Sequence, residues 1–171
     1  MLNRHLILCG FMACGKSTVG ALCAASLETS FTDTDTLIEL REQKSIPAIF
    51  AESGEAAFRD LEHETCLRLT ELSPRVIATG GGLPTFARNL APLHAAGTVI
   101  FIDRTFDGIW DSLSQRTGRP LASGRSREEM LALWEKRYPL YQAAADYTVV
   151  SDGTAEDCAR KILALVREKN L

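Results

Sequence analysis

The sequence predicts an α/β domain built on a parallel sheet. Short apolar runs alternate with amphipathic segments of helical length along its 171 residues, and strands that alternate with helices are typical of parallel sheets. The first run, Leu6–Cys9, is apolar at every position, as expected of a strand buried on both faces. A chain of this length fits one compact domain, so we expect a single domain over residues 1–171.

The apolar and helical patterns give the elements in order. After Leu6–Cys9, we expect strands at 31–33, 76–79, 98–102 and 147–150. Helical periodicity indicates helices at 16–27, 36–43, 46–53, 55–72, 106–115, 128–144 and 155–168. Gly118, Pro120 and Gly124 interrupt regular structure within Thr117–Arg127, which we interpret as a mobile loop. In open parallel sheets, ligands gather beyond the carboxyl ends of the strands, where the motifs below also lie.

Charge and composition argue against two classes of partner. The net charge is −3 and no basic block occurs, so we expect no nucleic-acid partner. No apolar run approaches the roughly 18–20 residues that span a bilayer, so we expect no membrane association. The first residues lead directly into a strand and leave no room for a signal peptide. The five cysteines form no CxxC pair, which predicts a reduced, cytoplasmic protein without disulfides or a zinc site.

The segment Gly10–Ser17 matches the phosphate-binding pattern GxxxxGK[ST] in full, after an apolar strand and at the start of a helix. Glycines let such a P-loop wrap closely around a polyphosphate, the lysine supplies a positive charge, and the hydroxyl can hold Mg²⁺. We interpret Cys14 as a small loop residue rather than a reactive thiol, although helix N-termini lower thiol pKa values. The predicted nucleotide-binding residues are Gly10, Ala13, Cys14, Gly15, Lys16, Ser17 and Thr18.

A carboxylate is expected beside the metal of a P-loop enzyme, and the residues offer two candidates. Asp103 ends the apolar strand at 98–102, whereas Asp33 ends the shorter second strand and stands two residues before Asp35. Two acids in this spacing can share one face, one toward the metal and the other toward a phosphate acceptor. Either aspartate could instead be a helix cap or turn residue. The residues alone leave the choice between Asp33 and Asp103 open.

Five further motifs follow the P-loop: Phe31-Thr32-Asp33-Thr34-Asp35, Phe58-Arg59-Asp60-Leu61-Glu62, Gly80-Gly81-Gly82, Arg119-Pro120-Leu121 and Arg137-Tyr138-Pro139-Leu140-Tyr141. Together and in this order, they resemble the shikimate kinase family over essentially the whole chain. The resemblance implies a three-layer P-loop kinase fold with a lid and a five-stranded parallel sheet of order 2-3-1-4-5. It also implies phosphorylation of the 3-hydroxyl of shikimate by ATP with Mg²⁺, in aromatic amino-acid biosynthesis, and it places Asp33 rather than Asp103 beside the metal.

The resemblance assigns the acceptor site to helices at about 34–62 and to residues further along the chain. Arg59 and Arg137 would bind the shikimate carboxylate, which suits the planar fork of a guanidinium group. Asp35 would orient or deprotonate the acceptor hydroxyl. Glu62 would orient Arg59 or a water. The remaining implied acceptor residues are Phe50 and Phe58, which would line the ring, and Gly80, Gly81 and Gly82, whose backbone can approach it closely.

The resemblance also makes residues 116–127 a lid. Arg119 would reach the transferring phosphate, where a cation stabilises the spread negative charge, and Arg116 would stack on the adenine. Ala122 stands where the family more often has leucine, so the resemblance does not define the packing of the lid. Arg125 and Arg127 are interpreted as solvated loop charges.

Simpler interpretations of the same residues stay open at this point. Arg59 and Glu62 could form an exposed ion pair of little energetic consequence, Gly80–Gly82 could be only a turn, and Arg137 could be a surface charge. The second candidate function is another small P-loop kinase, acting on gluconate, a nucleoside monophosphate or an antibiotic. A nucleotide-binding switch without transfer activity is the third. The acceptor motifs favour phosphorylation of shikimate over these two alternatives. We also expect a monomer with shikimate and ATP as its small-molecule partners.

Overall fold

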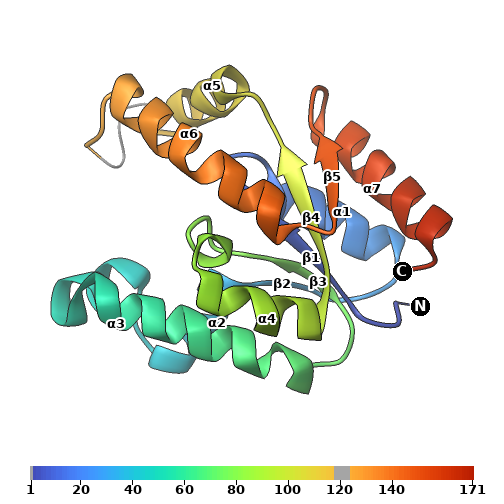
Figure 1. Ribbon diagram of the computed structural model, residues 1–171, viewed down its shortest axis with the longest axis horizontal. Helices are drawn as coiled ribbons and strands as arrows, with labels where there is room; N and C mark the ends of the chain where they lie inside the picture. The colour runs from blue at the N-terminus through green and yellow to red at the C-terminus, as the bar shows by residue number, and fades with distance from the viewer. Residues whose placement is uncertain (1, 118–123) are drawn as a thin grey trace.

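The computed structural model describes residues 2–117 and 124–171, and in these residues five parallel strands form one sheet. The strand order is β2-β3-β1-β4-β5, which confirms the predicted order and fold class (Figure 1). The strands are β1 (His5–Cys9), β2 (Phe31–Asp33), β3 (Val76–Ala78), β4 (Gly97–Asp103) and β5 (Tyr147–Val150).

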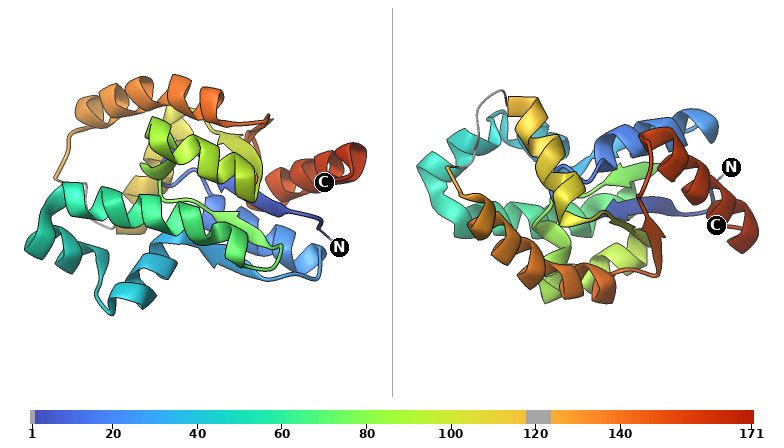
Figure 2. Two further views of the ribbon diagram at one scale, coloured as in Figure 1. Left: turned by 60° about the horizontal axis from the view of Figure 1, so that its bottom comes forward. Right: turned by 90° about the horizontal axis from the view of Figure 1, so that it is seen from above.

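Helices cover both faces of the sheet and give the three predicted layers (Figure 2). α1 (Lys16–Ser26) and α7 (Ala155–Lys169) pack together on one face, while α4 (Ala87–Ala96) and α6 (Arg127–Ala144) lie on the other. α3 (Ile46–Arg68) packs on α2 (Thr34–Glu42) and α4, and α5 (Phe106–Thr117) packs on α6. Two short 3-10 helices complete the described elements, η1 (Leu69–Glu71) and η2 (Leu83–Thr85). The two chain ends lie near each other, far from the start of α6.

The central strand β1 explains why the first apolar run has no polar position. Leu8 pairs with Ala78 of β3 on one side and with Ile100 of β4 on the other. Both faces are covered by helices, so Ile7 and Leu8 have no exposed surface. Because all strands run parallel, the residues that follow β1, β2 and β3 emerge at one edge of the sheet.

Backbone conformation fixes where the helices next to this edge begin. Gly10 and Gly15 have φ values of 143° and 106°, a region that strains residues with a Cβ atom, so the P-loop requires glycine at both positions. α2 begins at Thr34, two residues earlier than predicted, because the Asp33 side chain accepts a hydrogen bond from the backbone N–H of Asp35.

One helix of the structure was missing from the prediction, and a predicted break between two helices is present. We expected no helix between the third and fourth strands, but α4 fills ten residues there, with Pro92 inside it weakening its helical signal. The helices predicted at 46–53 and 55–72 are confirmed as two helical segments of α3, because Gly54 leaves helical conformation between them with φ 77° and ψ 178°. The second segment ends at Arg68, and the chain continues as the 3-10 helix η1.

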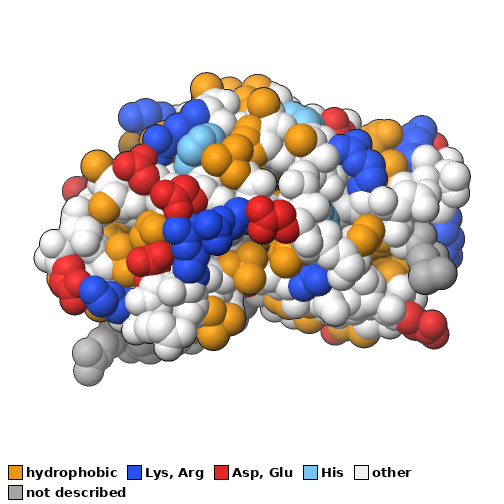
Figure 3. Space-filling view, turned by 90° about the horizontal axis from the view of Figure 1, so that it is seen from below, with side chains coloured by type: hydrophobic (Ala, Val, Ile, Leu, Met, Phe, Trp, Pro, Cys, Tyr) orange, Lys and Arg blue, Asp and Glu red, His pale blue; other side chains and the backbone are white. Residues whose placement is uncertain are grey.

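A small second core lies beneath α2 and α3, separate from the main core on the sheet. It consists of Ile38, Ile49 and Phe58. On the face that α2, α3 and α4 form, basic and acidic side chains interleave (Figure 3), and ion pairs such as Arg41–Glu64 and Arg88–Asp60 link the elements. None of the helices in the described ranges is both long and apolar enough to cross a lipid bilayer.

Gly97 offers a test of the sheet. It pairs with His5 across β1 and β4, and a Cβ atom there would collide with the His5 carbonyl oxygen and lie 2.8 Å from its carbonyl carbon. Backbone atoms in a sheet cannot move aside as a side chain can, so we expect Gly97→Ala to lower the free energy of unfolding by about 1–3 kcal/mol or more in urea titrations.

Gly108→Ala is the matched control. Gly108 lies in α5, and its added Cβ atom would meet mainly the movable side chain of Arg104. The higher helix propensity of alanine should make this change neutral or stabilising by up to about 1 kcal/mol. Equal destabilisation by both changes would contradict the explanation from strand pairing.

Candidate active site

The P-loop holds its lysine against its own backbone. Lys16 Nζ donates to the carbonyl oxygens of Gly10 at 2.8 Å and Phe11 at 2.9 Å, and the residue is buried. The positive charge is thus already placed over the loop in which phosphates would bind. Cys14 is only 1% exposed, with its Sγ 3.9 Å from Lys16 Nζ, which fits the interpretation as a small loop residue.

The structure brings together the two residues that the sequence assigned to the metal. Ser17 Oγ donates to Asp33 Oδ2 over 3.1 Å, at the start of α1 and the end of β2. The alternative acid, Asp103, lies at the end of β4 and accepts a hydrogen bond from the Tyr138 hydroxyl at 2.8 Å. Asp33 is also the cap of α2, as the simpler interpretation of this residue predicted.

Asp35 is a partly buried carboxylate with an unsatisfied oxygen. Its Oδ1 atom is buried and has no hydrogen-bond partner among the described residues. Burial, together with the charges of Asp33 and Glu62, raises the pKa of Asp35 from 3.8 to about 6, although Lys16 acts in the opposite direction. An ionised group held this way is ready to accept a hydrogen bond from a ligand hydroxyl.

The three glycines after β3 touch three different parts of the site. A Cβ atom on Gly80 would collide with Asp35 Oδ1, and one on Gly82 would lie 2.6 Å from Arg59 Nη1. A Cβ atom on Gly81 would lie 3.4 Å from the Met12 backbone nitrogen in the P-loop. The turn is therefore more than a connection, because its bare backbone joins the P-loop to the acceptor-side residues.

Arg59 forms an ion-pair network that is largely buried. Its Nη1 donates to Glu62 Oε2 at 2.8 Å, while Nε and Nη2 both donate to Glu55 Oε1, at 3.2 and 2.7 Å. The Arg59 and Glu62 side chains are only 15% and 1% exposed, so the interpretation as a surface ion pair is wrong. Glu55 is 66% exposed, and it holds the Nε and Nη2 edge of the guanidinium group.

Arg137 faces the same network from α6. The hydrogen bonds and charge of Arg59 lower the pKa of Glu55, and the charge of Arg137 lowers it further. Arg137 is partly buried, unlike its exposed neighbour Lys136, so it is not a fully solvated charge. One turn later, the buried Tyr141 donates its hydroxyl hydrogen to Gly81 O at 2.6 Å, which joins α6 to the triple-glycine turn.

Aromatic rings surround the Arg59 side chain. Its Cζ atom lies 5.4 Å from the ring centroid of Phe58 and 5.1 Å from that of Phe86. Phe58 is 5% exposed and belongs to the second core, whereas Phe50 is partly exposed and packs on Phe58 with ring centroids 4.7 Å apart. Phe50 is therefore the ring with surface available to a ligand.

The predicted lid falls mainly on residues that the structure does not describe. Arg119 lies outside the described residues, and so does the side chain of Arg116, whose backbone belongs to α5. Arg127 is not a loop charge, because it begins α6, pairs with Asp107 and lies over the ring of Phe106.

Sequence reasoning missed four residues that join these groups. Thr34, between the two aspartates, accepts a hydrogen bond from the Gly80 backbone N–H at 2.8 Å. The others are Glu55, Phe86 and Tyr141. The spacing of Glu55 to Arg59, and of Arg137 to Tyr141, is four residues on a helix, which places each pair on one face and is the signal that could have found them.

Comparison with known proteins agrees in both sequence and fold. A family model described as shikimate kinase matches residues 12–167. A shikimate kinase from Clostridium botulinum is 36% identical over 165 residues, covering 96% of this chain and 98% of the relative. One from Persephonella marina is 38% identical over 165 residues, covering 96% and 99%.

Two solved structures show the same agreement. Shikimate kinase from Acinetobacter baumannii, in complex with shikimate, superimposes with a TM-score of 0.88 at 34% identity, covering 98% of this chain and 95% of the other. Shikimate kinase from Aquifex aeolicus gives a TM-score of 0.83 at 37% identity, covering 98% of both chains. Likeness of this extent places the chain in the shikimate kinase family, and it is therefore a phosphotransferase enzyme.

Proposed function

We propose that the chain transfers the γ-phosphoryl group of ATP to the 3-hydroxyl of shikimate, giving shikimate 3-phosphate and ADP. The observation that carries this proposal is the contact of one turn, Gly80–Gly82, with the P-loop on one side and with Asp35 and Arg59 on the other. Donor and acceptor groups thereby converge, as direct transfer requires. The Acinetobacter relative, which is described as a complex with shikimate, supports the choice of acceptor.

On the donor side, backbone N–H groups of the P-loop and Lys16 bind the phosphates of ATP. Ser17 and Asp33 fit a magnesium ion, because they present two oxygen atoms within hydrogen-bonding distance of each other beside the P-loop, and Mg²⁺ prefers oxygen ligands. When bound, Mg²⁺ supplies positive charge that offsets the charge of the β- and γ-phosphates. We also assign Arg119 to the transferring phosphate and Arg116 to the adenine, on the family pattern alone.

On the acceptor side, Asp35 accepts the hydrogen bond of the reacting hydroxyl and thereby orients its oxygen toward the phosphorus. Its unpartnered Oδ1 atom supports this role. A largely dissociative transition state requires little proton removal, so orientation is the main contribution of Asp35. Phe50 packs against the ring of the acceptor, while Phe58 supports Phe50 from the second core.

The charge balance around Arg59 favours a monocarboxylate acceptor. Two arginines, Arg59 and Arg137, lie here with two glutamates, Glu55 and Glu62. The positive and negative charges of these four side chains nearly cancel. A nucleoside monophosphate would bring a dianionic phosphate, which needs more uncompensated positive charge than this set supplies. The five cysteines are buried free thiols, which supports a reducing, cytoplasmic environment.

An acceptor panel tests the proposed function. We expect ADP release, in a coupled assay with Mg²⁺ and ATP, to depend on shikimate and to stay at background with gluconate or AMP. The Lys16→Ala variant, which lacks the P-loop cation, provides the background. Turnover of gluconate or AMP but not shikimate would refute the assignment, and tight ATP binding without any acceptor turnover would favour the nucleotide-binding switch.

Asp35→Asn should lower the activity of the enzyme while raising its stability. Because the folded-state pKa is raised, ionisation of Asp35 destabilises the fold; this penalty is absent below pH 4 and complete above about pH 6. In metal-free buffer at pH 8 we expect Asp35→Asn to raise the free energy of unfolding by about 1–3 kcal/mol, with no gain at pH 4. The kcat should fall by about 100-fold or more.

Asp103→Asn is the control for that experiment. Unlike Asp35 Oδ1, the Asp103 carboxylate has a hydrogen-bond donor, the Tyr138 hydroxyl, and the change weakens that bond. It should show no gain in stability at pH 8. A less stable Asp35→Asn at pH 8, or one with the kcat of the unmutated protein, would remove Asp35 from the role assigned to it.

Glu55→Gln should tighten acceptor binding. The Glu55 carboxylate occupies the Nε and Nη2 donors of Arg59 that a ligand carboxylate needs, so the two compete. An exposed ion pair contributes about 0.5–1 kcal/mol, so we expect the shikimate KM to fall about 2- to 5-fold with an unchanged ATP KM. Glu52→Gln is the control, because Glu52 also lies in α3 but its carboxylate pairs with the exposed Lys44. This change should alter neither KM. A higher shikimate KM for Glu55→Gln would mean that Glu55 positions Arg59 instead of competing.

A further inference from the structure

All three carbonyl groups of the triple-glycine turn accept hydrogen bonds, whereas two of its N–H groups have no partner among the described residues. Gly80 O accepts from Leu83 N at 3.2 Å, and Gly82 O accepts from the backbone N–H and hydroxyl of Thr85. Within residues 2–117 and 124–171, the N–H groups of Gly81 and Gly82 have no hydrogen-bond partner. Each of these N–H groups is a donor that an oxygen-rich ligand can use.

The middle peptide of this turn depends on one distant side chain. Gly81 O accepts its hydrogen bond from the Tyr141 hydroxyl at 2.6 Å. The described peptide bonds are all trans, so the carbonyl of Gly81 and the N–H of Gly82, which belong to one peptide unit, point in opposite directions. Tyr141 therefore also fixes the direction of the Gly82 N–H. Neither glycine has a Cβ atom that would restrict rotation of this peptide if the hydroxyl were lost.

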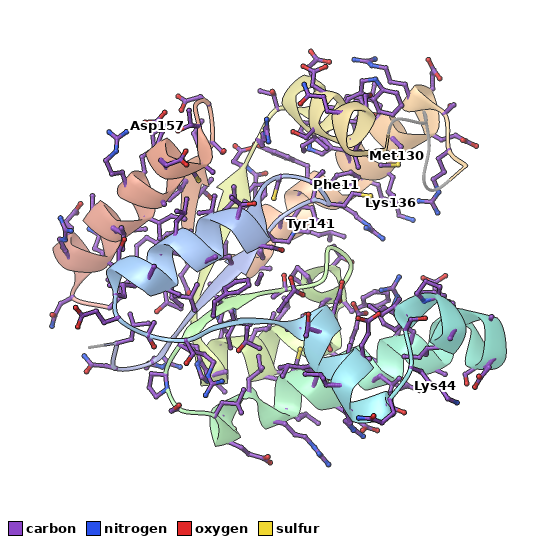
Figure 4. All side chains as sticks on the ribbon, turned by 180° about the vertical axis from the view of Figure 1, so that it is seen from behind. Phe11, Lys44, Met130, Lys136, Tyr141 and Asp157 are labelled. Carbon is purple, nitrogen blue, oxygen red and sulfur yellow. The ribbon has the colours of Figure 1, made fainter. Side chains whose placement is uncertain are left out.

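Packing holds the Tyr141 side chain in a fixed orientation. Its side chain has no exposed surface, and its ring stacks on Phe101 of β4 with centroids 5.5 Å apart. Figure 4 shows Tyr141 in the middle of the molecule, while Met130 lies toward the outer end of the same helix. Burial raises the pKa of Tyr141 although Arg137 acts in the opposite direction, so the hydroxyl keeps its proton and stays a donor.

We propose that Tyr141 is a positioning residue for the acceptor: its hydroxyl holds the Gly81–Gly82 peptide so that the Gly82 N–H is aimed at an oxygen of a hydroxylated carboxylic acid. The flanking glycines touch Asp35 and Arg59, so the peptide lies between the groups assigned to the hydroxyl and the carboxylate. Tyr141 also stands one helical turn after Arg137, which places both acceptor contacts of α6 on one face. This inference rests on the proposed function.

Tyr141→Phe tests the proposal, because it removes the hydroxyl and leaves the ring that stacks on Phe101. We expect the shikimate KM to rise about 5- to 20-fold, while kcat stays within about threefold and the ATP KM within about twofold. Tyr138→Phe is the matched control, since it removes a hydroxyl from the same helix that donates to Asp103 and not to the turn. It should leave the shikimate KM unchanged.

The pattern of the constants separates positioning from a general structural role. Equal increases in both KM values, accompanied by a lower Tm, or an unchanged shikimate KM, would overturn the proposal. If the unmutated protein uses another acceptor from the panel, the proposed function fails, and the same KM comparison with that acceptor decides the role of Tyr141.

A second measurement needs no variant. In ¹⁵N-labelled unmutated protein, saturation with shikimate should shift the amide resonance of Gly82, because the free N–H gains an acceptor. An unshifted Gly82 amide at saturation would overturn the proposal even if Tyr141→Phe did not fold. In folded Tyr141→Phe, the shift of this amide at saturation should be smaller than in the unmutated protein.

Discussion

The close approach of Gly80–Gly82 to its neighbours is the constraint on which the two-substrate arrangement depends. The P-loop follows β1, the paired aspartates follow β2 and the glycines follow β3, and parallel pairing brings these three ends to one edge of the sheet. A Cβ atom at Gly80 or Gly82 would displace the Asp35 or Arg59 side chain, and one at Gly81 would just contact the P-loop backbone. The absence of Cβ atoms at Gly80 and Gly82 therefore lets Asp35 and Arg59 lie close to the turn that runs beside the P-loop.

Two long-range hydrogen bonds give this turn a fixed shape. Thr34, at the start of α2, accepts from the Gly80 N–H, and Tyr141, in α6, donates to the Gly81 carbonyl. The turn is thus held from both sides by elements that also carry acceptor-side residues, Asp35 on α2 and Arg137 on α6. A shift of either helix would change the backbone donors together with the charged side chains.

Sequence patterns alone predicted the alternation of strands and helices and the P-loop, whereas the sheet order and the choice of Asp33 as the partner of Ser17 came from the resemblance to the shikimate kinase family. Helix α4 was missed because Pro92 and the glycine-rich approach weaken the local helical signal, and packing on β4 and α3 stabilises it instead. The burial of the Arg59–Glu62 pair could not be predicted, since spacing on a helix says nothing of what packs above it. The contact of Tyr141 with Gly81 is set by tertiary structure alone.

The break in α3 at Gly54 has a consequence for how ligands are exchanged. Because Gly54 leaves helical conformation, Glu55 stands in the first turn of a new helical segment, where backbone N–H groups lack intrahelical partners and the helix dipole favours negative charge. In the proposed function, an acceptor carboxylate that binds Arg59 would displace Glu55, and the displaced Glu55 would keep this favourable local field instead of becoming an isolated charge. Exchange of the Glu55 carboxylate for a ligand carboxylate at Arg59 would therefore change the free energy little in either direction. This suits an enzyme that must release its product in every cycle.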